Sequence, residues 1–322
     1  MPSLSDWTIP PPFQPRPGDY GYDLDTALSA VVGIRTAVPE DAFTADTLGT
    51  ERAGNGVVIR PDGLIVTIGY LVTEADQVWI TLANGRLVPG HVVAYDQATG
   101  FGLVQALAHV ESPALSLGQS RHARVGDAVV IAGHGGRQRS IAGRIVSKQE
   151  FAGYWEYLID EAIFTAPAHP HWGGTAVIDS TGRLIGVGSL QLQQADENQH
   201  LNMVVPIDLL TPILDDLLTV GARRELPRPW LGLYATEIDD NVVIAGVASG
   251  GPAEQAGLQT GDIVLAVAGS EVSDLAGLFR RIWSLGSAGV AVPLRIHRSG
   301  RTFDVSLLSK DRNALLKRPR TH

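Results

Sequence analysis

Short apolar runs separated by turn residues dominate the first two thirds of the chain. Runs such as 56–60, 64–67 and 101–106 are bounded by Pro-Asp-Gly, Ala-Asn-Gly or Ala-Thr-Gly. Runs of this length between Gly, Pro, Asn and Asp are typical of β-strands. We expect further strands at 31–35, 77–82, 87–95, 125–132, 140–148, 157–165, 174–178, 184–190 and 202–206. This spacing predicts a mainly β chain that contains a pair of six-stranded barrels.

Two later segments have a helical period instead. Apolar residues recur every three or four positions in 207–220, and again in 274–285. This period predicts amphipathic helices. Between them, the polar and proline-containing stretch 222–229 is expected to be a linker. We therefore predict a proline-rich arm of low structural content over 1–22, a first domain over 23–221 with a surface loop at 39–55, a second domain over 230–309, and a basic tail over 310–322.

Composition narrows the class of protein. The 322 residues are 44% hydrophobic, which is enough for two cores, and the net charge of −9 argues against a general nucleic-acid binder. Cysteine is absent, which excludes disulfides, thiol catalysis and cysteine zinc sites. We see neither a signal peptide at the start nor a membrane-spanning stretch, which predicts a cytoplasmic protein without membrane insertion, or a periplasmic one if the N-terminus was trimmed.

A glycine-rich loop late in the first domain carries the most specific signal. Residues 165–174 read Thr-Ala-Pro-Ala-His-Pro-His-Trp-Gly-Gly, and a strand, an Asp-containing turn and a second strand follow over 176–187. This segment resembles the nucleophile loop of the HtrA (high-temperature-requirement) family of trypsin-like serine proteases, which reads Thr-Asp-Ala-x-Ile-Asn-Pro-Gly-Asn-Ser-Gly-Gly. The resemblance places Trp172 where the family has its serine.

The same resemblance locates the other two catalytic positions. Residues 56–72 resemble the two strands that lead to the family's Val-Thr-Asn-x-His-Val-Val, with Tyr70 at the histidine. Residues 95–104 resemble its Asp-x-x-Thr-Asp-Leu-Ala-Val-Leu, with Gly100 at the aspartate. The resemblance covers roughly residues 25 to 308 and implies a trypsin-like double barrel.

These three residues cannot perform the family's chemistry. That chemistry needs a hydroxyl nucleophile, an imidazole that takes its proton and a carboxylate that orients the imidazole. A tyrosine hydroxyl with a pKa near 10 is a poor base, and loss of a comparable triad costs about a million-fold in turnover. Pro170 donates no N–H, so we do not expect the usual oxyanion-binding loop to form. The sequence predicts a pseudoprotease with no catalytic residues.

Residues 230–308 resemble a PDZ domain of the HtrA type. The matching motifs are Trp-Leu-Gly-Leu at 230–233, the long segment 249–269 with its Pro-Ala, Ala-Gly-Leu and Gly-Asp elements, and Arg-Ser-Gly-Arg at 298–301. In such domains a peptide C-terminus adds a strand to a sheet edge, and backbone N–H groups hold its carboxylate. The resemblance assigns peptide binding to Trp230, Leu231, Gly232 and Leu233, with Leu275, Leu278 and Ile282 as the opposite wall. These leucines are equally suited to a core.

A different chemistry could reside in three histidines. His169 and His171 lie in the altered loop, and His134 lies in Gly133 to Gly136, which resembles another turn of the family. Converging imidazoles can bind zinc, and zinc can activate water. The loop contains no Asp or Glu, so no metal and no cofactor are expected. The alternative remains a hydrolase built on Tyr70 and these histidines, or a weak serine protease with residues supplied from elsewhere.

Taken together, the residues predict a catalytically inactive HtrA-like protein. We expect it to bind peptide C-termini or unfolded protein segments and to act as scaffold, regulator or chaperone in protein quality control. Family members assemble as trimers through aromatic residues near the N-terminus, a role for which Phe13, Tyr20 and Tyr22 are available. An active HtrA relative is a further expected partner.

Overall fold

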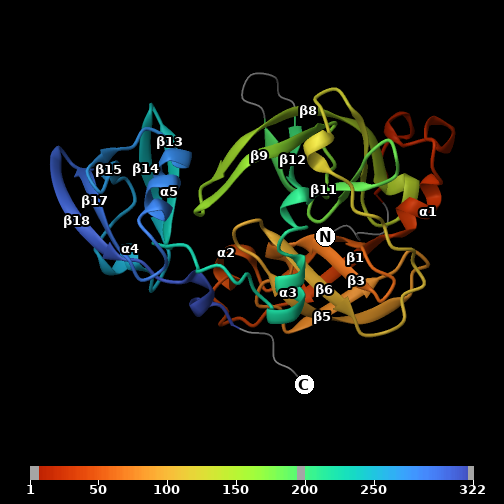
Figure 1. Ribbon diagram of the computed structural model, residues 1–322, viewed down its shortest axis with the longest axis horizontal. Coiled ribbons are helices and arrows are strands. Elements are labelled where there is room, and N and C mark those ends of the chain that lie inside the picture. The colour runs from red at the N-terminus through yellow and green to blue at the C-terminus, as the bar shows by residue number, and fades with distance from the viewer. Residues whose placement is uncertain (1–6, 194–199, 318–322) are drawn as a thin grey trace. The chain divides into compact units, whose positions relative to one another are not determined.

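Antiparallel strands form most of the structure, a computed structural model that describes residues 7–193 and 200–317. The chain divides into two units (Figure 1). The first holds the residues up to Gln149, then 161–223, and Lys317; the second holds 150–160 and 224–316. The mainly β prediction is confirmed.

The first barrel is built from the strands that the turn signals delimit. They are β1 (Val31–Ala37), β2 (Glu51–Val58), β3 (Leu64–Ile68), β4 (Gln77–Thr81), β5 (Leu87–Tyr95) and β6 (Phe101–Ala106), and they close in the order β1-β2-β3-β6-β5-β4. All of β3 is buried, because its residues face either the barrel interior or neighbouring elements.

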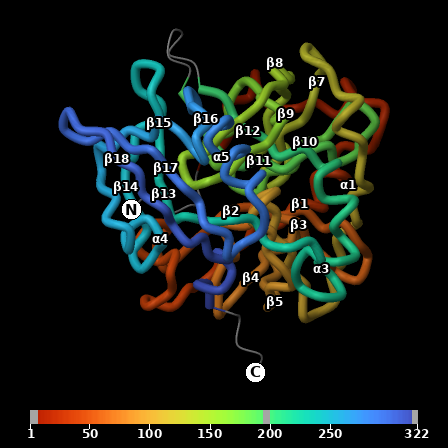
Figure 2. Tube along the Cα trace, turned by 60° about the vertical axis from the view of Figure 1, so that its left-hand side comes forward, coloured from red at the N-terminus to blue at the C-terminus, as the bar shows by residue number. Residues whose placement is uncertain are grey.

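The second barrel repeats this order. Its strands are β7 (Ala128–Ala132), β8 (Ser140–Gly153), β9 (Tyr157–Ala166), β10 (Ala176–Ile178), β11 (Leu184–Gln193) and β12 (His200–Pro206), closed as β10-β11-β12-β9-β8-β7. Its core contains Ile131, Ile163, Val177 and Ile185. The two barrels lie side by side within the first unit (Figures 1 and 2). The predicted pair of six-stranded barrels is confirmed.

The N-terminal arm is more ordered than its proline content suggests. It forms the 3-10 turns η1 (Pro11–Phe13) and η2 (Pro17–Asp19) before helix α1 (Leu24–Ser29). Ile9 is 3% exposed in the core of the second barrel, and its N–H donates to the carbonyl of Gln138 (2.8 Å). The expectation of low structural content is wrong from Trp7 onward, because an apolar side chain between prolines anchors the arm. Residues 1–6 lie outside the described part of the chain.

Two further expectations about segments of the first unit need correction. The surface loop predicted over 39–55 contains helix α2 (Ala45–Leu48) and the first half of β2. In β2, Arg52 and Asn55 are buried because their polar groups find hydrogen-bond partners, a form of burial that hydrophobic periodicity does not reveal. The helix predicted over 207–220 is split into η6 (Ile207–Leu209) and α3 (Leu214–Val220), which ends at Gly221 with φ 76°.

The second unit is an α+β sheet. The strands β13 (Leu233–Ile238), β14 (Asn241–Val247), β15 (Ile263–Val267), β17 (Ala291–Arg298) and β18 (Arg301–Leu308) follow in that order, and β16 (Ser270–Glu271) pairs with β15. Helices α4 (Pro252–Gln255) and α5 (Leu275–Ser284) and the turn η7 (Arg312–Leu315) complete it. Strand β13 forms one edge of the sheet, the position at which such domains receive a peptide.

The hairpin formed by β8 and β9 contributes to both units. Its tip, residues 150–160, groups with the second unit, whereas the rest of both strands belongs to the second barrel.

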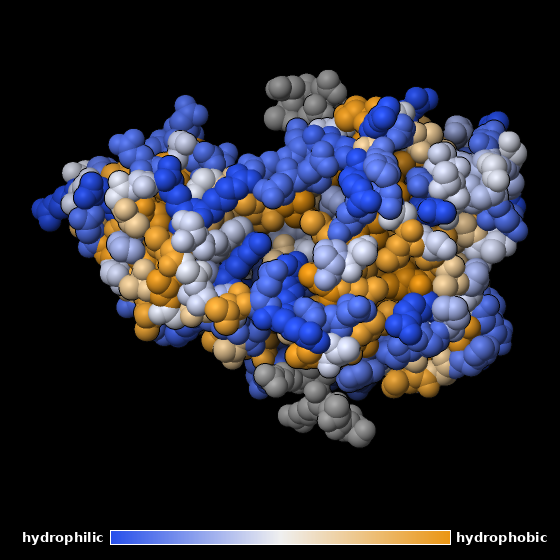
Figure 3. Space-filling view, in the orientation of Figure 1, coloured by the Kyte–Doolittle hydropathy of each residue, from blue (hydrophilic) through white to orange (hydrophobic). Residues whose placement is uncertain are grey.

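On the face shown in Figure 3, hydrophilic residues form much of the outline and hydrophobic residues gather in patches between them. No helix in the described part of the chain has the length and apolar character needed to cross a membrane.

Candidate functional site

A cleft of about 950 Å³ opens in the first unit. Residues from both barrels and from the N-terminal arm line it. They include Trp7, Arg35, Asn55, Tyr70, Trp79, His134, Arg139, His171, Trp172 and Gly173. Trp7 was not predicted to belong to a site, because nothing in a proline-rich arm indicates where it folds back.

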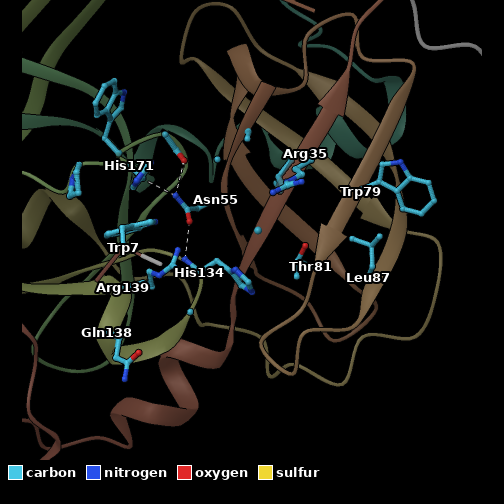
Figure 4. Close-up of a pocket in the computed structure, with 18 of the residues that line it drawn as sticks. Trp7, Arg35, Asn55, Trp79, Thr81, Leu87, His134, Gln138, Arg139 and His171 are labelled. Atoms are coloured by element: carbon cyan, nitrogen blue, oxygen red, sulfur yellow. Dashed lines mark hydrogen bonds between the residues drawn. The ribbon is translucent and has the colours of Figure 1, made fainter. Parts of the chain in front are cut away.

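Asn55 lies at the centre of this cleft and connects its walls (Figure 4). Its side-chain N–H groups donate to the carbonyls of His171 (3.0 Å) and Gly173 (3.1 Å). Its side-chain oxygen accepts from the backbone N–H of His134 (2.8 Å). One asparagine of the first barrel therefore holds two loops of the second barrel in register. Sequence reasoning missed it, although it directly precedes the recognised run at Gly56.

Tyr70 lies on the 3-10 turn η3 (Gly69–Leu71). Its hydroxyl donates to the carbonyl of Ser189 (2.8 Å), and its own carbonyl accepts from the buried guanidinium of Arg52 (2.8 Å). Burial raises the pKa of Tyr70 above its ordinary value, and a hydrogen bond with the Trp172 side chain opposes this only in part. A phenol held in this way is a donor at neutral pH and cannot act as a general base.

The loop that carries Trp172 is tightly packed against the first barrel. The Trp172 carbonyl accepts from the N–H (3.1 Å) and the hydroxyl (2.9 Å) of Thr175. Gly174 has φ 77°, and a Cβ there would lie 1.8 Å from the carbonyl oxygen of Asn55. Gly174 is thus required by backbone contact, independently of any chemistry at position 172, whereas a Cβ at Gly173 would meet the Tyr70 hydroxyl (2.6 Å).

Gly100 lies outside the lining of the cleft but contacts the turn that carries Tyr70. Its carbonyl accepts from the N–H of Gly69 (2.6 Å), and its own N–H donates to the carbonyl of Asp96 (2.7 Å). The Asp96 carboxylate pairs with Arg223 (2.8 Å). The structure therefore brings Tyr70 and Trp172 together in the cleft and places Gly100 next to them through Gly69.

The predicted peptide-binding residues lie together in the second unit. Leu231 and Leu233 at the start of β13, and Leu278 and Ile282 on α5, are each at most 1% exposed in one apolar cluster, which Leu275 joins at 7%. The backbone N–H groups of Leu231, Gly232 and Leu233 all donate to the side-chain carboxylate of Glu156. Glu156 was not predicted, because it is remote in sequence and belongs to the β8–β9 hairpin.

Comparisons with known proteins agree with this architecture. One family model, described as a trypsin-like peptidase domain, matches residues 54–187, and another, described as a PDZ domain, matches 229–308. A probable periplasmic serine endoprotease DegP-like from Chlamydia pneumoniae is 25% identical over 270 residues, which cover 78% of this chain and 54% of that protein. A serine protease Do-like HtrA from Bacillus subtilis is 23% identical over 320 residues, covering 88% and 70%. The chain is thus similar to DegP-like and HtrA serine proteases over most of its length, with one match to a trypsin-like peptidase domain and one to a PDZ domain.

A solved structure supports the fold of this chain. The HtrA-type protease AlgW with decapeptide superposes with a TM-score of 0.54 at 21% sequence identity, over 92% of this chain and 98% of that one. The chain spans about half the length of the first DegP-like relatives, 54% and 56% of two of them.

The three histidines that the sequence singles out have structural partners in the fold. His169 is fully buried; its Nδ1 accepts from the N–H of His171 (3.1 Å), and its Nε2 donates to the carbonyl of Arg139 (2.9 Å). Burial lowers the pKa of His169 to about 4. Both ring nitrogens are occupied, so this imidazole is a neutral structural group.

The other two histidines line the cleft. His134 has Nε2 3.2 Å from the carbonyl of Leu82, to which it donates, and burial lowers its pKa. Burial also lowers the pKa of His171, whose ring lies 4.3 Å from that of Trp7. Within residues 7–193 and 200–317, no group of three His, Cys, Asp or Glu side chains is placed to hold a metal ion. The histidines therefore do not form one converging metal-binding cluster in the described part of the chain.

Proposed function

We propose that this HtrA-type protein is catalytically inactive and acts by binding peptides or unfolded protein segments. The observation that carries the proposal is the arrangement of Tyr70 and Trp172 in the cleft. The Tyr70 hydroxyl is committed to the carbonyl of Ser189 (2.8 Å), and burial raises its pKa. An indole stands where the family resemblance places the nucleophile, and an indole has no group that attacks a carbonyl.

Two further candidates for a base and its orienting carboxylate, His169 and Asp96, are held by contacts within the fold. A general base must reach the proton that it removes, and its neighbour must orient it. His169 uses both ring nitrogens within the fold, and the Asp96 carboxylate is held by Arg223 and Thr99. These contacts support a cleft whose polar groups maintain structure. The alternative, a hydrolase based on Tyr70 and the histidines, would rely on Tyr70, His134 and His171, which line the same cleft, and casein cleavage decides between the two.

The binding role rests on the second unit. Its carboxylate loop at residues 231–233 presents converging N–H groups, and its edge strand β13 faces α5 across an apolar cluster. This arrangement suits a peptide C-terminus added as an extra strand. We propose peptide C-termini and unfolded segments as partners, and a scaffold, regulatory or chaperone role in protein quality control.

Assembly and location are further parts of the proposal. A homotrimer, alone or mixed with an active HtrA relative, would use the N-terminal aromatic residues. Phe13 is 48% exposed and free to meet a neighbour, whereas the Tyr22 ring packs at Gly182 within the chain. Phe13 is thus the better candidate for an intersubunit contact.

The names of the DegP-like relatives favour the periplasmic alternative over the cytoplasmic expectation.

Casein cleavage tests this function. Unfolded casein is incubated with the purified protein, with a chelator-treated sample, and with a triple variant carrying Tyr70→His, Gly100→Asp and Trp172→Ser. We expect the wild-type protein to show no cleavage above the blank. Cleavage that survives repurification would overturn the proposal, and its loss on chelation would direct attention to a metal-dependent site.

A further inference from the structure

The tip of the β8–β9 hairpin occupies the carboxylate loop of the second unit. Tyr154, Trp155 and Glu156 form the connecting turn between the two strands. One Glu156 oxygen accepts from the N–H groups of Leu231 (3.1 Å), Gly232 (2.7 Å) and Leu233 (2.9 Å). Three converging backbone donors are the means by which such a loop recognises a peptide carboxylate. Here a side chain of the same chain provides that carboxylate.

The hairpin also contacts the edge strand and the helix that flank the groove. The carbonyl of Tyr154 accepts from the N–H of Ala235 on β13 (3.0 Å). Ala152 and Leu158 pack against the apolar cluster of the second unit. From α5, Arg280 forms ion pairs with Glu150 and Asp160, one from each arm of the hairpin. Carboxylate, backbone and apolar contacts are thus all made at the sites that a bound peptide would use.

The backbone at Glu156 is held in a conformation that glutamate disfavours. Its φ is 60°, in the left-handed region. A three-residue hairpin turn places its third residue there, and glycine is the usual choice. The backbone conformation alone would favour glycine at position 156, and contact with the apolar cluster alone would favour an apolar group. The chain instead has a glutamate there, and this residue is only 6% exposed. Strain combined with a buried carboxyl group points to a role in binding.

We propose that residues 150–160 are an intramolecular ligand of the peptide groove, and that a peptide with a free C-terminal carboxylate binds only by displacing them. This inference rests on the peptide-binding function proposed above. The competing groups have the same chemistry, because the α-carboxylate of the peptide and the Glu156 side chain need the same three N–H donors. The groove therefore binds external peptides weakly until the hairpin leaves, since apparent affinity falls with the fraction of open groove.

Peptide capture by the full-length protein tests the competition. The probe is a pool of synthetic decapeptides with four randomised C-terminal residues, prepared once with a free carboxylate and once as the amide. The proteins are the wild type, Glu156→Gln, and a variant in which 152–158 are replaced by Asn-Gly. The control is Glu161→Gln, which removes an exposed carboxylate from the same strand, where it pairs with Lys148.

We expect the two hairpin variants to retain at least about tenfold more of the carboxylate pool than the wild type and the control, with no gain for the amide pool. Equal retention above the blank by wild type and hairpin variants would contradict the inference.

Hydrogen exchange separates this inference from the proposed function. The amides of Leu231, Gly232 and Leu233 are followed in the wild type and in Glu156→Gln. Protection in the wild type, with exchange at least about tenfold faster in Glu156→Gln, supports the internal ligand even if no variant retains any peptide. That combination would refute only the peptide-binding function. Unprotected amides in the wild type would overturn the inference whatever the capture experiment shows.

Discussion

The cleft of the first unit and the carboxylate loop of the second unit are both filled by groups of the chain itself. In the cleft, Tyr70 and Trp172 lie in a backbone framework fixed by Asn55 and the Gly173-Gly174 pair. On the carboxylate loop, Glu156 arrives on a hairpin tip held largely by hydrogen bonds and surface ion pairs. The first arrangement can change only with the fold, whereas the second can be exchanged for an external ligand.

The backbone around the cleft is closely packed at the positions that the family resemblance assigns to the triad. Gly69 and Gly100 meet closely, with 2.6 Å between the Gly69 nitrogen and the Gly100 oxygen. On the carboxylate loop, three N–H donors instead meet a carboxylate of the same chain. Each of the following changes tests one side of this contrast.

The largest effect is expected for Gly174→Ala. Its new Cβ would lie 1.8 Å from the Asn55 carbonyl oxygen at a positive φ, so the backbone of the cleft would have to move. We expect a loss of roughly 3 kcal/mol or more in the free energy of unfolding of the first unit, measured by urea denaturation. Gly136→Ala is the matched control, because its φ is 71° and nothing lies within 4 Å of the new Cβ. It should cost about 1 kcal/mol, and equal losses would contradict a rigid cleft.

Acid should destabilise the first unit through His169. Its pKa is about 4 in the folded protein and near 6.5 when unfolded, so the unfolded chain binds the proton first as pH falls. The contribution of the neutral His169 ring to the free energy of unfolding is complete above pH 6.5. As the pH falls to 4, this contribution is lost progressively, by roughly 3 kcal/mol. Urea denaturation between pH 4 and pH 6.5 should show that the free energy of unfolding depends less on pH in His169→Gln than in the wild type. His122→Gln, at an exposed position on η4 (Ser120–His122), should keep the wild-type slope.

A smaller effect is expected for Tyr70→Phe. This change removes the donor to the Ser189 carbonyl and leaves that oxygen unsatisfied in a buried site. The expected loss is about 1 to 2 kcal/mol, again by urea denaturation. Tyr154→Phe on the hairpin tip is the control, since Tyr154 is 49% exposed, and it should change stability by less than about 0.5 kcal/mol. If Tyr70→Phe leaves the free energy of unfolding unchanged, the hydroxyl is not committed to the Ser189 carbonyl.

The smallest effect concerns Arg280→Met. Its ion pairs with Glu150 and Asp160 are about half exposed, so they contribute at most about 1 kcal/mol. We expect exchange of the amides of residues 231–233 to accelerate by up to about fivefold at low salt. The difference should shrink at high salt, where screening already weakens the pairs in the wild type. A salt-independent change would mean that Arg280 acts through packing.

The sequence predicted the barrels well because their strands follow hydrophobic periodicity and turn chemistry. Tyr70 and Trp172 were placed through their flanking motifs, and the structure brings both into the cleft. Whether they mark a lost triad remains a prediction. The predicted groove residues Leu231, Leu278 and Ile282 also lie in one cluster.

What the sequence did not predict depends on long-range contacts. Asn55 is buried by hydrogen bonds to loops more than 75 residues away, and Trp7 packs on His171 from an arm that has no periodic pattern. Glu156 meets residues 75 to 77 positions later. Such polar pairings leave no signature in local composition, so only the folded chain reveals them.

The central claim is that the cleft holds no activated serine, and intact-mass analysis after incubation with a fluorophosphonate probe tests it most directly. The chain has no cysteine, so adducts report on hydroxyl nucleophiles. With trypsin as the positive control, we predict that the protein keeps its unmodified mass. A stoichiometric adduct that peptide mapping places on a serine of the first unit would contradict the account and establish an active protease.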